Sequence, residues 1–222
     1  MIFAKYASIL AVFLLVGSII TPCLADESVQ SSATSANTQS KEDFVKSMTA
    51  SVLATVHDSN KSFVQKQAIL VKTFTDVVDT SWIARFVLGK TWNMATDEQK
   101  EQYTALYRTY LTNTYVANFD EETANKLQDI KILGLSDADD DRFVVHSEMV
   151  MATGENVKVD YLLHDKDGQY KIIDIVAEGV SLLATHRSQF SELASAGGVS
   201  GVIEKLHQMS SSKQSTVAEL TK

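Results

Sequence analysis

Hydrophobic positions from Glu42 onward follow a helical period in three successive segments. The first has an apolar residue at every fourth position from Phe44 to Val56. The second runs from Phe63 to Val77, and the third, shorter one from Trp82 to Val87. Because Gly89 follows the third stripe directly, this segment is expected to end there. The pattern therefore predicts three helices in the first half of the chain.

A further helix is predicted to start at Thr96. Thr96 and Gln99 are spaced as in a capping box, in which each side chain binds a free backbone N–H of the other residue. Asp97 and Glu98 between them suit the positive end of a helix dipole. The face that follows is broad and apolar, with Tyr103, Leu106, Tyr107, Tyr110 and Leu111.

After about Leu127 the hydrophobic period changes from four to two, which is typical of strands. Four strands are predicted, around residues 130–132, 143–151, 157–163 and 170–176. Asp167-Gly168 is a strong hairpin signal between the last two. Ile172 and Ile173 are adjacent apolar residues, so the alternation breaks there and a bulge is possible.

The C-terminal part returns to a helical pattern. A helix is predicted from about Ser181 to Ala196, a break at Gly197-Gly198, and a second helix from Val199 to Met209. Helices, then antiparallel strands, then helices indicate one α+β domain over residues 42–209, with helices packed on a four-stranded antiparallel sheet. Residues 210–222 form a polar tail that is expected to fray.

The N-terminus has the three-part plan of a secretory signal peptide. Lys5 is the only charge, a mainly apolar run extends from Ala7 to Ile20, and a small-x-small pattern ends at Ala25. Residues 1–25 are therefore expected to be removed. The run is short for a retained membrane anchor, and Pro22 before Cys23 does not favour a lipoprotein. Residues 26–41, rich in serine, threonine, glutamine and asparagine, are expected to form a flexible leader.

Cleavage would remove Lys5 and the only cysteine and proline of the chain. The 20 basic residues less Lys5 leave 19 against 28 acidic ones, a net charge of −9. Disulfides are then excluded, and the remaining chain is long enough to bury a core without them. An acidic exported protein is a poor candidate for nucleic acid or for anionic lipid surfaces.

Motifs for catalysis or metal binding are weak. Asp137, Asp139 and Asp141 have the spacing of a calcium loop, but Arg142 stands where such a loop needs glycine, so a solvated loop between strands is favoured. The five histidines have no metal-ligand spacing, and no nucleophile elbow or phosphate loop is present. We therefore expect no catalytic residues, no metal and no cofactor.

Three blocks of the sequence resemble a known family. Residues 174–190 contain Asp174, Glu178-Gly-Val-Ser181 and Arg187-Ser-Gln-Phe190 in the order and spacing of its signature. Residues 82–115 match a second block at Val87-Leu-Gly89, Trp92, Ala95-Thr96 and Glu98-Gln99. A third block pairs residues 157–161 with Tyr170-Lys-Ile172, although tryptophan is commoner at position 170. The chain resembles the periplasmic phospholipid-binding proteins of the Mla lipid-transport system, the toluene-tolerance auxiliary family.

This resemblance implies a carrier without enzymatic activity that works in the periplasm. Members hold a phospholipid by its acyl chains in an apolar cavity between a twisted sheet and helices. They pass it between an outer-membrane lipoprotein complex and an inner-membrane ABC transporter complex, which maintains outer-membrane lipid asymmetry. A hopanoid-associated branch of the same family shares much of the pattern, so a hopanoid-associated lipid-binding protein is the alternative within the family. The alternative from another class is an adapter with a solid core.

The candidate lipid-binding residues come from two sources. Strand parity selects Phe143, Val145, Met149, Val159 and Tyr161, while position on a stripe selects Trp82, Phe86, Leu106, Tyr110, Ile173 and Phe190. Arg187 has two interpretations. It either anchors the helix through a carboxylate such as Glu178 or Asp174, or contacts a headgroup phosphate at the rim.

Overall fold

The computed structural model describes residues 41–115, 121–139 and 141–219. The predicted signal peptide and all of the predicted leader except Lys41 lie outside these ranges. Lys41 is the first residue of helix α2.

The molecule has two parts, a sheet part and a helical part. The sheet part contains a single antiparallel sheet. Its strands lie in sequence order: β1 (Leu127–Asp137), β2 (Arg142–Met151), β3 (Asn156–Lys166), β4 (Gln169–Ala177) and β5 (Val180–Ser181). The α+β class is confirmed, but the sheet has five strands and not four. The fifth was missed because it has only two residues, which pair with Val176 and Ala177.

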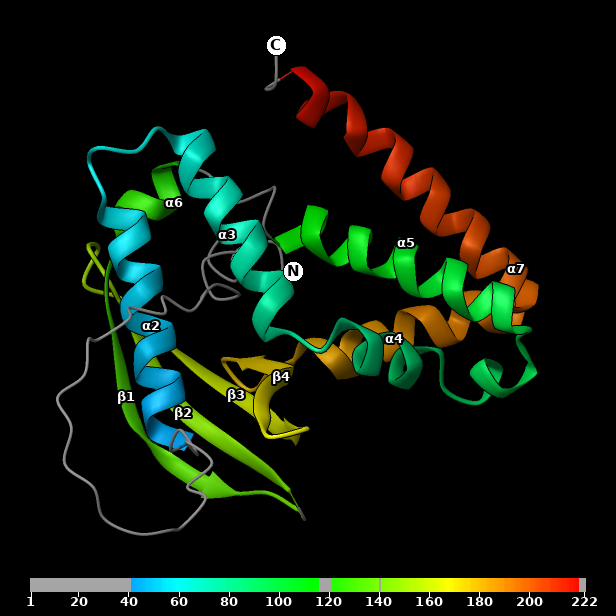
Figure 1. The fold of residues 1–222 in the computed structure, drawn as a ribbon, viewed down its shortest axis with the longest axis horizontal. Helices are drawn as coiled ribbons and strands as arrows, with labels where there is room; N and C mark the ends of the chain where they lie inside the picture. The colour runs from blue at the N-terminus through cyan, green and yellow to red at the C-terminus, as the bar shows by residue number, and fades with distance from the viewer. Residues whose placement is uncertain (1–40, 116–120, 140, 220–222) are drawn as a thin grey trace, which may run out of the picture.

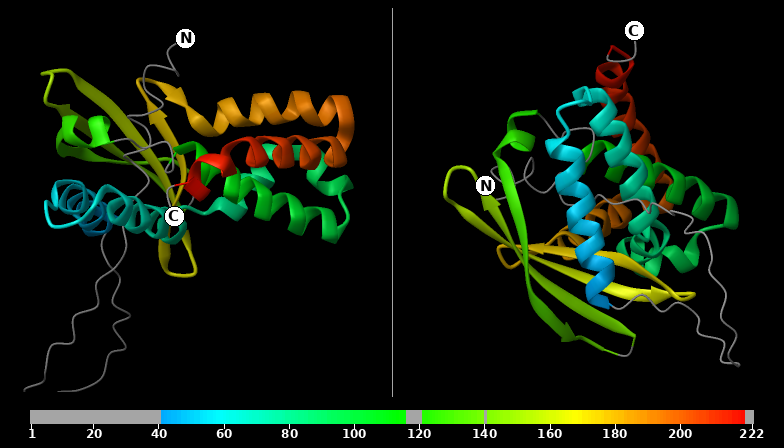
Figure 2. Two further views of the ribbon diagram at one scale, coloured as in Figure 1. Left: turned by 90° about the horizontal axis from the view of Figure 1, so that it is seen from above. Right: turned by 60° about the vertical axis from the view of Figure 1, so that its left-hand side comes forward.

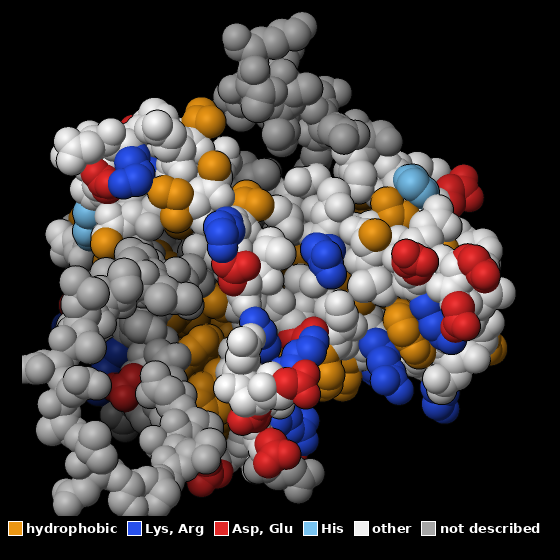
Figure 3. Space-filling model, viewed as in Figure 1, with side chains coloured by type: hydrophobic (Ala, Val, Ile, Leu, Met, Phe, Trp, Pro, Cys, Tyr) orange, Lys and Arg blue, Asp and Glu red, His pale blue; other side chains and the backbone are white. Residues whose placement is uncertain are grey.

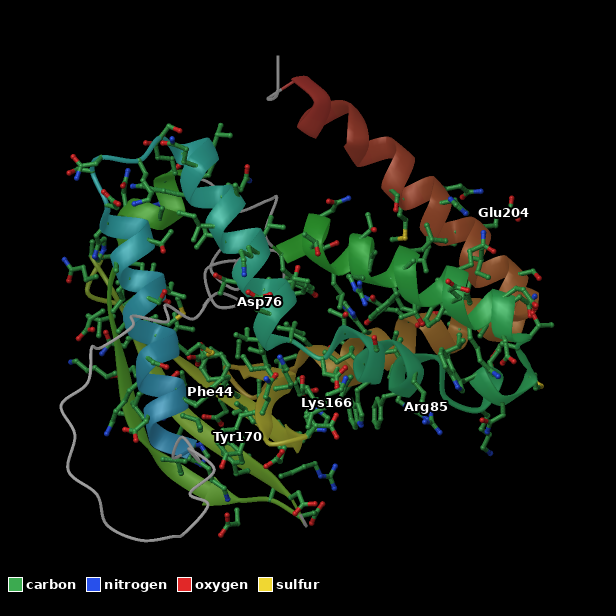
Figure 4. The ribbon with its side chains drawn as sticks, in the orientation of Figure 1. Phe44, Asp76, Arg85, Lys166, Tyr170 and Glu204 are labelled. Carbon is green, nitrogen blue, oxygen red and sulfur yellow. The ribbon has the colours of Figure 1, made fainter. Side chains whose placement is uncertain are left out.

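One face of the sheet is buried and the other is open to solvent. Along β2, every second side chain from Phe143 to Met151 is buried, and the intervening ones are partly exposed. Helices α2 (Lys41–His57) and α3 (Phe63–Val77) cover the buried face (Figure 1). Phe44 of α2 contacts Tyr170 of β4, with ring centroids 5.8 Å apart (Figure 4). A short helix, α6 (Glu121–Lys126), precedes β1 and was not predicted.

The second part of the molecule is a group of helices beside β4 and β5. It contains α4 (Thr80–Leu88), the 3₁₀ helix η1 (Gly89–Met94), α5 (Asp97–Tyr115) and α7 (Leu182–Glu219) (Figure 1). The predicted capping box is confirmed: the Gln99 N–H donates to Thr96 Oγ1 at 3.2 Å, and the Thr96 N–H donates to Gln99 Oε1 at 3.0 Å. Tyr103 of α5 donates to the Ala84 carbonyl of α4 at 3.1 Å, which joins these helices.

Helix α7 reverses direction at Gly198, where the backbone is not helical (φ 60°, ψ −161°). The reversal brings the second half of α7 back beside α5 (Figure 2). The predicted break at Gly197-Gly198 is therefore present. The segment expected to fray after Met209 continues as helix to Glu219.

Two local features of the β3–β4 hairpin follow from its sequence. Asp167 and Gly168 both have positive φ, 56° and 80°, as a two-residue hairpin turn requires. Leu162 pairs with Asp174 and Leu163 pairs with Ile172, so Ile173 is the extra residue of a bulge. Both Ile172 and Ile173 are buried as a result.

In the described part of the chain, no helix combines the length and apolar character needed to cross a membrane.

Candidate functional site

An apolar cavity of about 40 Å³ lies where the sheet part and the helical part meet. It is lined by α3 and α4, Val78 between them, the C-terminal end of α5, the bulged part of β4, and the first turns of α7. The lining residues are Phe74, Val78, Ile83, Leu111, Tyr115, Ile172, Ile173, Asp174, Ile175, Leu182, Leu183 and His186.

The corner between β4 and α7 places two leucines in this cavity. Glu178 and Gly179 both have positive φ, 49° and 79°, and reverse the chain. Asp174 then caps α7: its carboxylate accepts from the Leu183 N–H at 2.9 Å and from the Ser181 hydroxyl at 2.6 Å. Burial raises the pKa of Asp174 even though these bonds oppose the shift. The cap therefore fixes Leu182 and Leu183 against the bulge of β4.

A polar bridge crosses the aromatic wall of the cavity. His186 of α7 lies between two tyrosines of α5, with Nδ1 2.7 Å from the Tyr107 hydroxyl and Nε2 2.8 Å from the Tyr115 hydroxyl. Burial lowers the pKa of His186 to about 4 and raises the pKa of both tyrosines. All three groups are neutral at pH 7, so one imidazole nitrogen donates and the other accepts. The bridge joins α5 to α7 at the cavity.

The other side of the junction is held by a buried carboxylate. Asp79 caps α4 by accepting from the Trp82 N–H at 3.0 Å. The Lys166 ammonium lies 2.8 Å from its Oδ2, and His164 Nε2 lies 3.2 Å away. Burial alone would raise the pKa of Asp79, but Lys166 and the Trp82 N–H hold it below its usual value. Lys166 extends from the β3–β4 hairpin toward α4 (Figure 4), so this group ties the sheet to the helical part.

The cavity is much smaller than the sequence-based expectation required. Pockets that enclose small molecules measure about 300–1,000 Å³, roughly ten times this volume. The predicted apolar cavity between sheet and helices is therefore present, but at this volume it is too small to hold acyl chains. It lies at the junction between the two parts of the molecule.

The predicted lipid-binding residues occupy three places. Ile173 lines the cavity. The five strand residues, from Phe143 to Tyr161, are at most 2 % exposed and form the core beneath α2 and α3. Phe190, Leu106 and Tyr110 belong to the packing of α5 against α7, and Trp82 and Phe86 line an outer groove. Whether these residues contact lipid stays a prediction.

Several cavity residues were not among the candidates. Ile83, Leu111 and Tyr115 lie on predicted helices, but a stripe on one helix does not show which neighbour it faces. His186 entered the sequence analysis only as one of five histidines without metal-ligand spacing. The signal that could have found it is its spacing from Leu182 and Leu183, one helical turn earlier on the same face.

Arg187 makes neither of the predicted carboxylate contacts. Its Nη1 donates to the Phe86 carbonyl at the end of α4, and its guanidinium lies 4.7 Å from the centre of the Phe86 ring. Asp174 is occupied by the α7 cap, and Glu178 accepts from the Lys158 N–H at 2.6 Å. Arg187 therefore anchors α7 to α4 through a carbonyl and a ring, and the phosphate interpretation stays untested.

A hydrogen-bonded chain of Ser136, His146 and Asp160 was also missed. The Ser136 hydroxyl lies 2.9 Å from His146 Nε2, and His146 Nδ1 lies 2.9 Å from Asp160 Oδ1. The residues come from β1, β2 and β3, so only the strand register brings them together. They lie on the open face of the sheet, opposite the buried side chains of β2, and therefore do not reach the cavity.

No group of three or more histidine, cysteine, aspartate or glutamate side chains in the described ranges could hold a metal ion. Two residues of the acidic cluster instead form ion pairs: Asp139 with Arg142 at 2.8 Å, and Asp137, the last residue of β1, with Lys41 of α2 at 3.2 Å.

Comparison with known proteins agrees with the overall fold. The family model described as MlaC protein matches residues 36–208. The chain belongs to the MlaC protein family. Among solved structures, it is similar to the phospholipid-binding protein from Ralstonia solanacearum, determined in complex with a phospholipid. The two are 27% identical, with a TM-score of 0.62, over 73% of this chain and 92% of the other. The family resemblance found in the sequence is thereby confirmed.

Proposed function

We propose that this MlaC-family protein is a periplasmic phospholipid carrier that holds acyl chains at the junction between its sheet part and its helical part. The observation that supports this most directly is the apolar cavity enclosed by β4, α4, α5 and α7 in a chain whose solved relative holds a phospholipid. Cargo would pass between an outer-membrane lipoprotein complex and an inner-membrane ABC transporter complex, and so maintain outer-membrane asymmetry. Export would use the predicted cleaved signal peptide.

The physics of the cargo explains why a carrier must enclose the tails. Each buried methylene contributes about 0.8 kcal/mol, so two chains of ~15 carbons correspond to on the order of 20 kcal/mol of unfavourable exposure to water. Headgroup contacts at a surface cannot offset the unfavourable free energy of exposing the acyl chains to water. The two parts must therefore separate to admit the chains, with the cavity as the point where separation starts.

Native mass spectrometry of the purified mature chain tests the proposal. We expect a co-purifying mass of phospholipid size. Leu183→Phe should lower the lipid-bound fraction, because Leu183 lines the cavity and is only 8 % exposed. Leu133→Phe makes the same chemical change at a position that is 59 % exposed on β1 and should leave the bound fraction unchanged. Thermal unfolding of both variants checks that overpacking has not abolished the fold.

Three outcomes would contradict parts of the proposal. Repeated recovery of bare protein favours the adapter without cargo. A co-purifying mass of hopanoid size would mean that the protein is a carrier whose cargo is a hopanoid and not a phospholipid. Equal lipid-bound fractions in the two variants would show that the acyl chains do not bind in this cavity.

A hydrolytic role is tested in the same sample. Incubation with phospholipid should release no fatty acid. Release that disappears in Ser136→Ala would assign catalysis to the chain of Ser136, His146 and Asp160 on the open face of the sheet.

A further inference from the structure

Both tryptophans of the chain line one groove on the outside of the helical part. The sequence contains two tryptophans, Trp82 and Trp92, and both belong to a groove of about 310 Å³ between α4, η1 and α7. Phe86, Arg85 and Arg187 complete its aromatic and basic lining. This groove is separate from the cavity, although α4 contributes to both.

The aromatic and basic side chains form an ordered layer. The Trp82 and Phe86 rings stack with centroids 5.2 Å apart and 12° between their planes. The Arg187 guanidinium covers the Phe86 ring from 4.7 Å. Gly89 permits this approach, because a Cβ atom there would lie 3.0 Å from Arg187 Nη2. Despite this packing, Phe86 is 38 % exposed.

The charge of this surface is opposite to that of the whole chain. The chain carries −8, but the groove lining has two arginines and no acidic residue. Lys90 follows Gly89 directly. Among the described residues, Arg85 and Lys90 are exposed and have no ion-pair partner. Arg85 extends outward from α4 (Figure 4), and Figure 3 shows basic and hydrophobic side chains in this region, with acidic side chains beside them.

An exposed apolar residue extends the same surface. Met94, at the end of η1, is 73 % exposed and is among the few large apolar side chains of the described residues that face water. Aromatic rings and flexible apolar side chains beside arginines suit the boundary between lipid headgroups and acyl chains. Arginine in addition forms paired hydrogen bonds with phosphate oxygens.

We propose that the surface formed by Trp82, Arg85, Phe86, Lys90, Trp92, Met94 and Arg187 docks the protein on the surface of an anionic phospholipid bilayer. Docking through this local patch overcomes the repulsion that the net charge imposes elsewhere. It also orients the molecule, since Ile83 on the same helix lines the cavity. A bilayer is favoured over an acidic protein because stacked aromatic rings beside arginines suit the boundary between lipid headgroups and acyl chains. Ile83 lines the cavity from a different side of α4, so docking would place α4 between bilayer and cavity. The use of this arrangement for lipid uptake rests on the proposed carrier function.

Tryptophan fluorescence is a direct test, because both tryptophans report from the groove. The mature chain is titrated with vesicles of phosphatidylglycerol and phosphatidylcholine, and in parallel with vesicles of phosphatidylcholine alone. We expect a blue shift and co-sedimentation only with the anionic vesicles. Both signals should fall steeply at high salt, since exposed charges are then screened.

A matched pair of charge reversals separates the patch from net charge. Arg85→Glu with Lys90→Glu should weaken vesicle binding by about tenfold or more. Lys131→Glu with Lys158→Glu makes the same change in net charge at exposed positions of β1 and β3 and should retain binding. None of the four side chains has an ion-pair partner among the described residues. Lys131 and Lys158 lie directly opposite Glu148 in the sheet, where added glutamates repel, so thermal unfolding of both variants confirms the fold before binding is compared.

The docking surface is overturned if anionic vesicles cause no shift, or if both double variants lose binding equally. It is also overturned if the groove binds an acidic protein and no vesicle. These results are independent of the carrier function. If lipid co-purifies with the protein but vesicles do not bind it, only the docking proposal fails. If vesicles bind the protein but no lipid co-purifies, only the carrier proposal fails.

Discussion

His186 makes the stability of the cavity wall depend on pH. Its pKa is about 4 in the folded protein and 6.5 when unperturbed, because burial disfavours the imidazolium. Above pH 6.5 both folded and unfolded chains hold it neutral. Between pH 6.5 and 4 only the unfolded chain takes up the proton, so stability falls as pH falls. The shift corresponds to roughly 3 kcal/mol over that window.

His186→Gln should remove this dependence. Glutamine still offers a donor and an acceptor to Tyr107 and Tyr115, but it does not titrate. Compared with the variant, the wild type should lose roughly 2–3 kcal/mol more unfolding free energy between pH 7.5 and pH 4.5. Urea denaturation at the two pH values measures the difference. At pH 7.5 the variant should be less stable by about 1–2 kcal/mol, because two buried hydrogen bonds are replaced by poorer ones.

His207→Gln is the control, since His207 is exposed on α7. It should keep the pH dependence of the wild type. If His186→Gln shows the same slope as the wild type, His186 is not the group that titrates between pH 4 and 6.5, and the assignment of the bridge fails.

Individual positions could be read from the sequence where one local rule decides them. Thr96 and Gln99 form the predicted cap, and Asp167-Gly168 forms the predicted turn. Asp174 and Ser181 were quoted as a motif, yet their role as the cap of α7 depends on a corner that only the folded chain creates. Arg187 was expected to bind either a carboxylate or a headgroup phosphate, but a carbonyl at a helix end and an aromatic face also satisfy a guanidinium.

The α7 helical hairpin depends on Gly198 and not on its neighbour Gly197. At φ 60° and ψ −161°, Gly198 lies in a region that is essentially restricted to glycine. Gly198→Ala should therefore lower the unfolding free energy by about 1–3 kcal/mol, even though no other atom lies within 4 Å of the new Cβ. Chemical denaturation gives the difference.

Gly197→Ala is the matched substitution one residue earlier. Gly197 does not have positive φ, and its Cβ would also meet no atom within 4 Å. Alanine there should raise stability by about 0.5–1 kcal/mol. Similar effects of the two substitutions would mean that the reversal does not depend on the backbone of Gly198.

Helices and strands were predictable in kind because each has one buried face. Strand parity correctly separated the buried from the exposed side of β2 and β3. Helix α4 shows the limit of this reasoning, because it is packed on more than one side. Ile83 faces the cavity while Trp82 and Phe86 face the outer groove, and a single apolar stripe covers all three. Strand β5 and helix α6 are too short to produce a detectable period.

The sheet part and the helical part share one continuous hydrophobic core and meet at the cavity. The chain crosses between them three times, between α3 and α4, between α5 and α6, and between β5 and α7. The link from α3 to α4 is fixed where the Asp79 N–H donates to the Ile172 carbonyl at 3.0 Å. The link from β5 to α7 follows the positive-φ corner at Glu178 and Gly179. The cavity of about 40 Å³ interrupts this shared core between the two parts, so we expect the parts to separate there.

Lipid loading should therefore increase the distance between the two parts. Spin labels at Leu133→Cys on β1 and Ala105→Cys on α5 report across the junction, and both positions are exposed. The only native cysteine, Cys23, lies in the segment that is expected to be cleaved, so it should not compete for label. Pulsed electron paramagnetic resonance of loaded and delipidated protein should show the distance longer by several ångström in the loaded state.

A label pair within the helical part separates opening from general loosening. Ala105→Cys with Glu204→Cys joins α5 to the second half of α7, and Glu204 is exposed (Figure 4). This distance should stay constant on loading, because both labels lie within the helical part and the distance between them does not cross the junction. A change in both pairs would indicate that the helices rearrange among themselves. Constancy of both would mean that acyl chains enter without separating the sheet from the helices, and a cavity of this size at β4 could not then be where they bind.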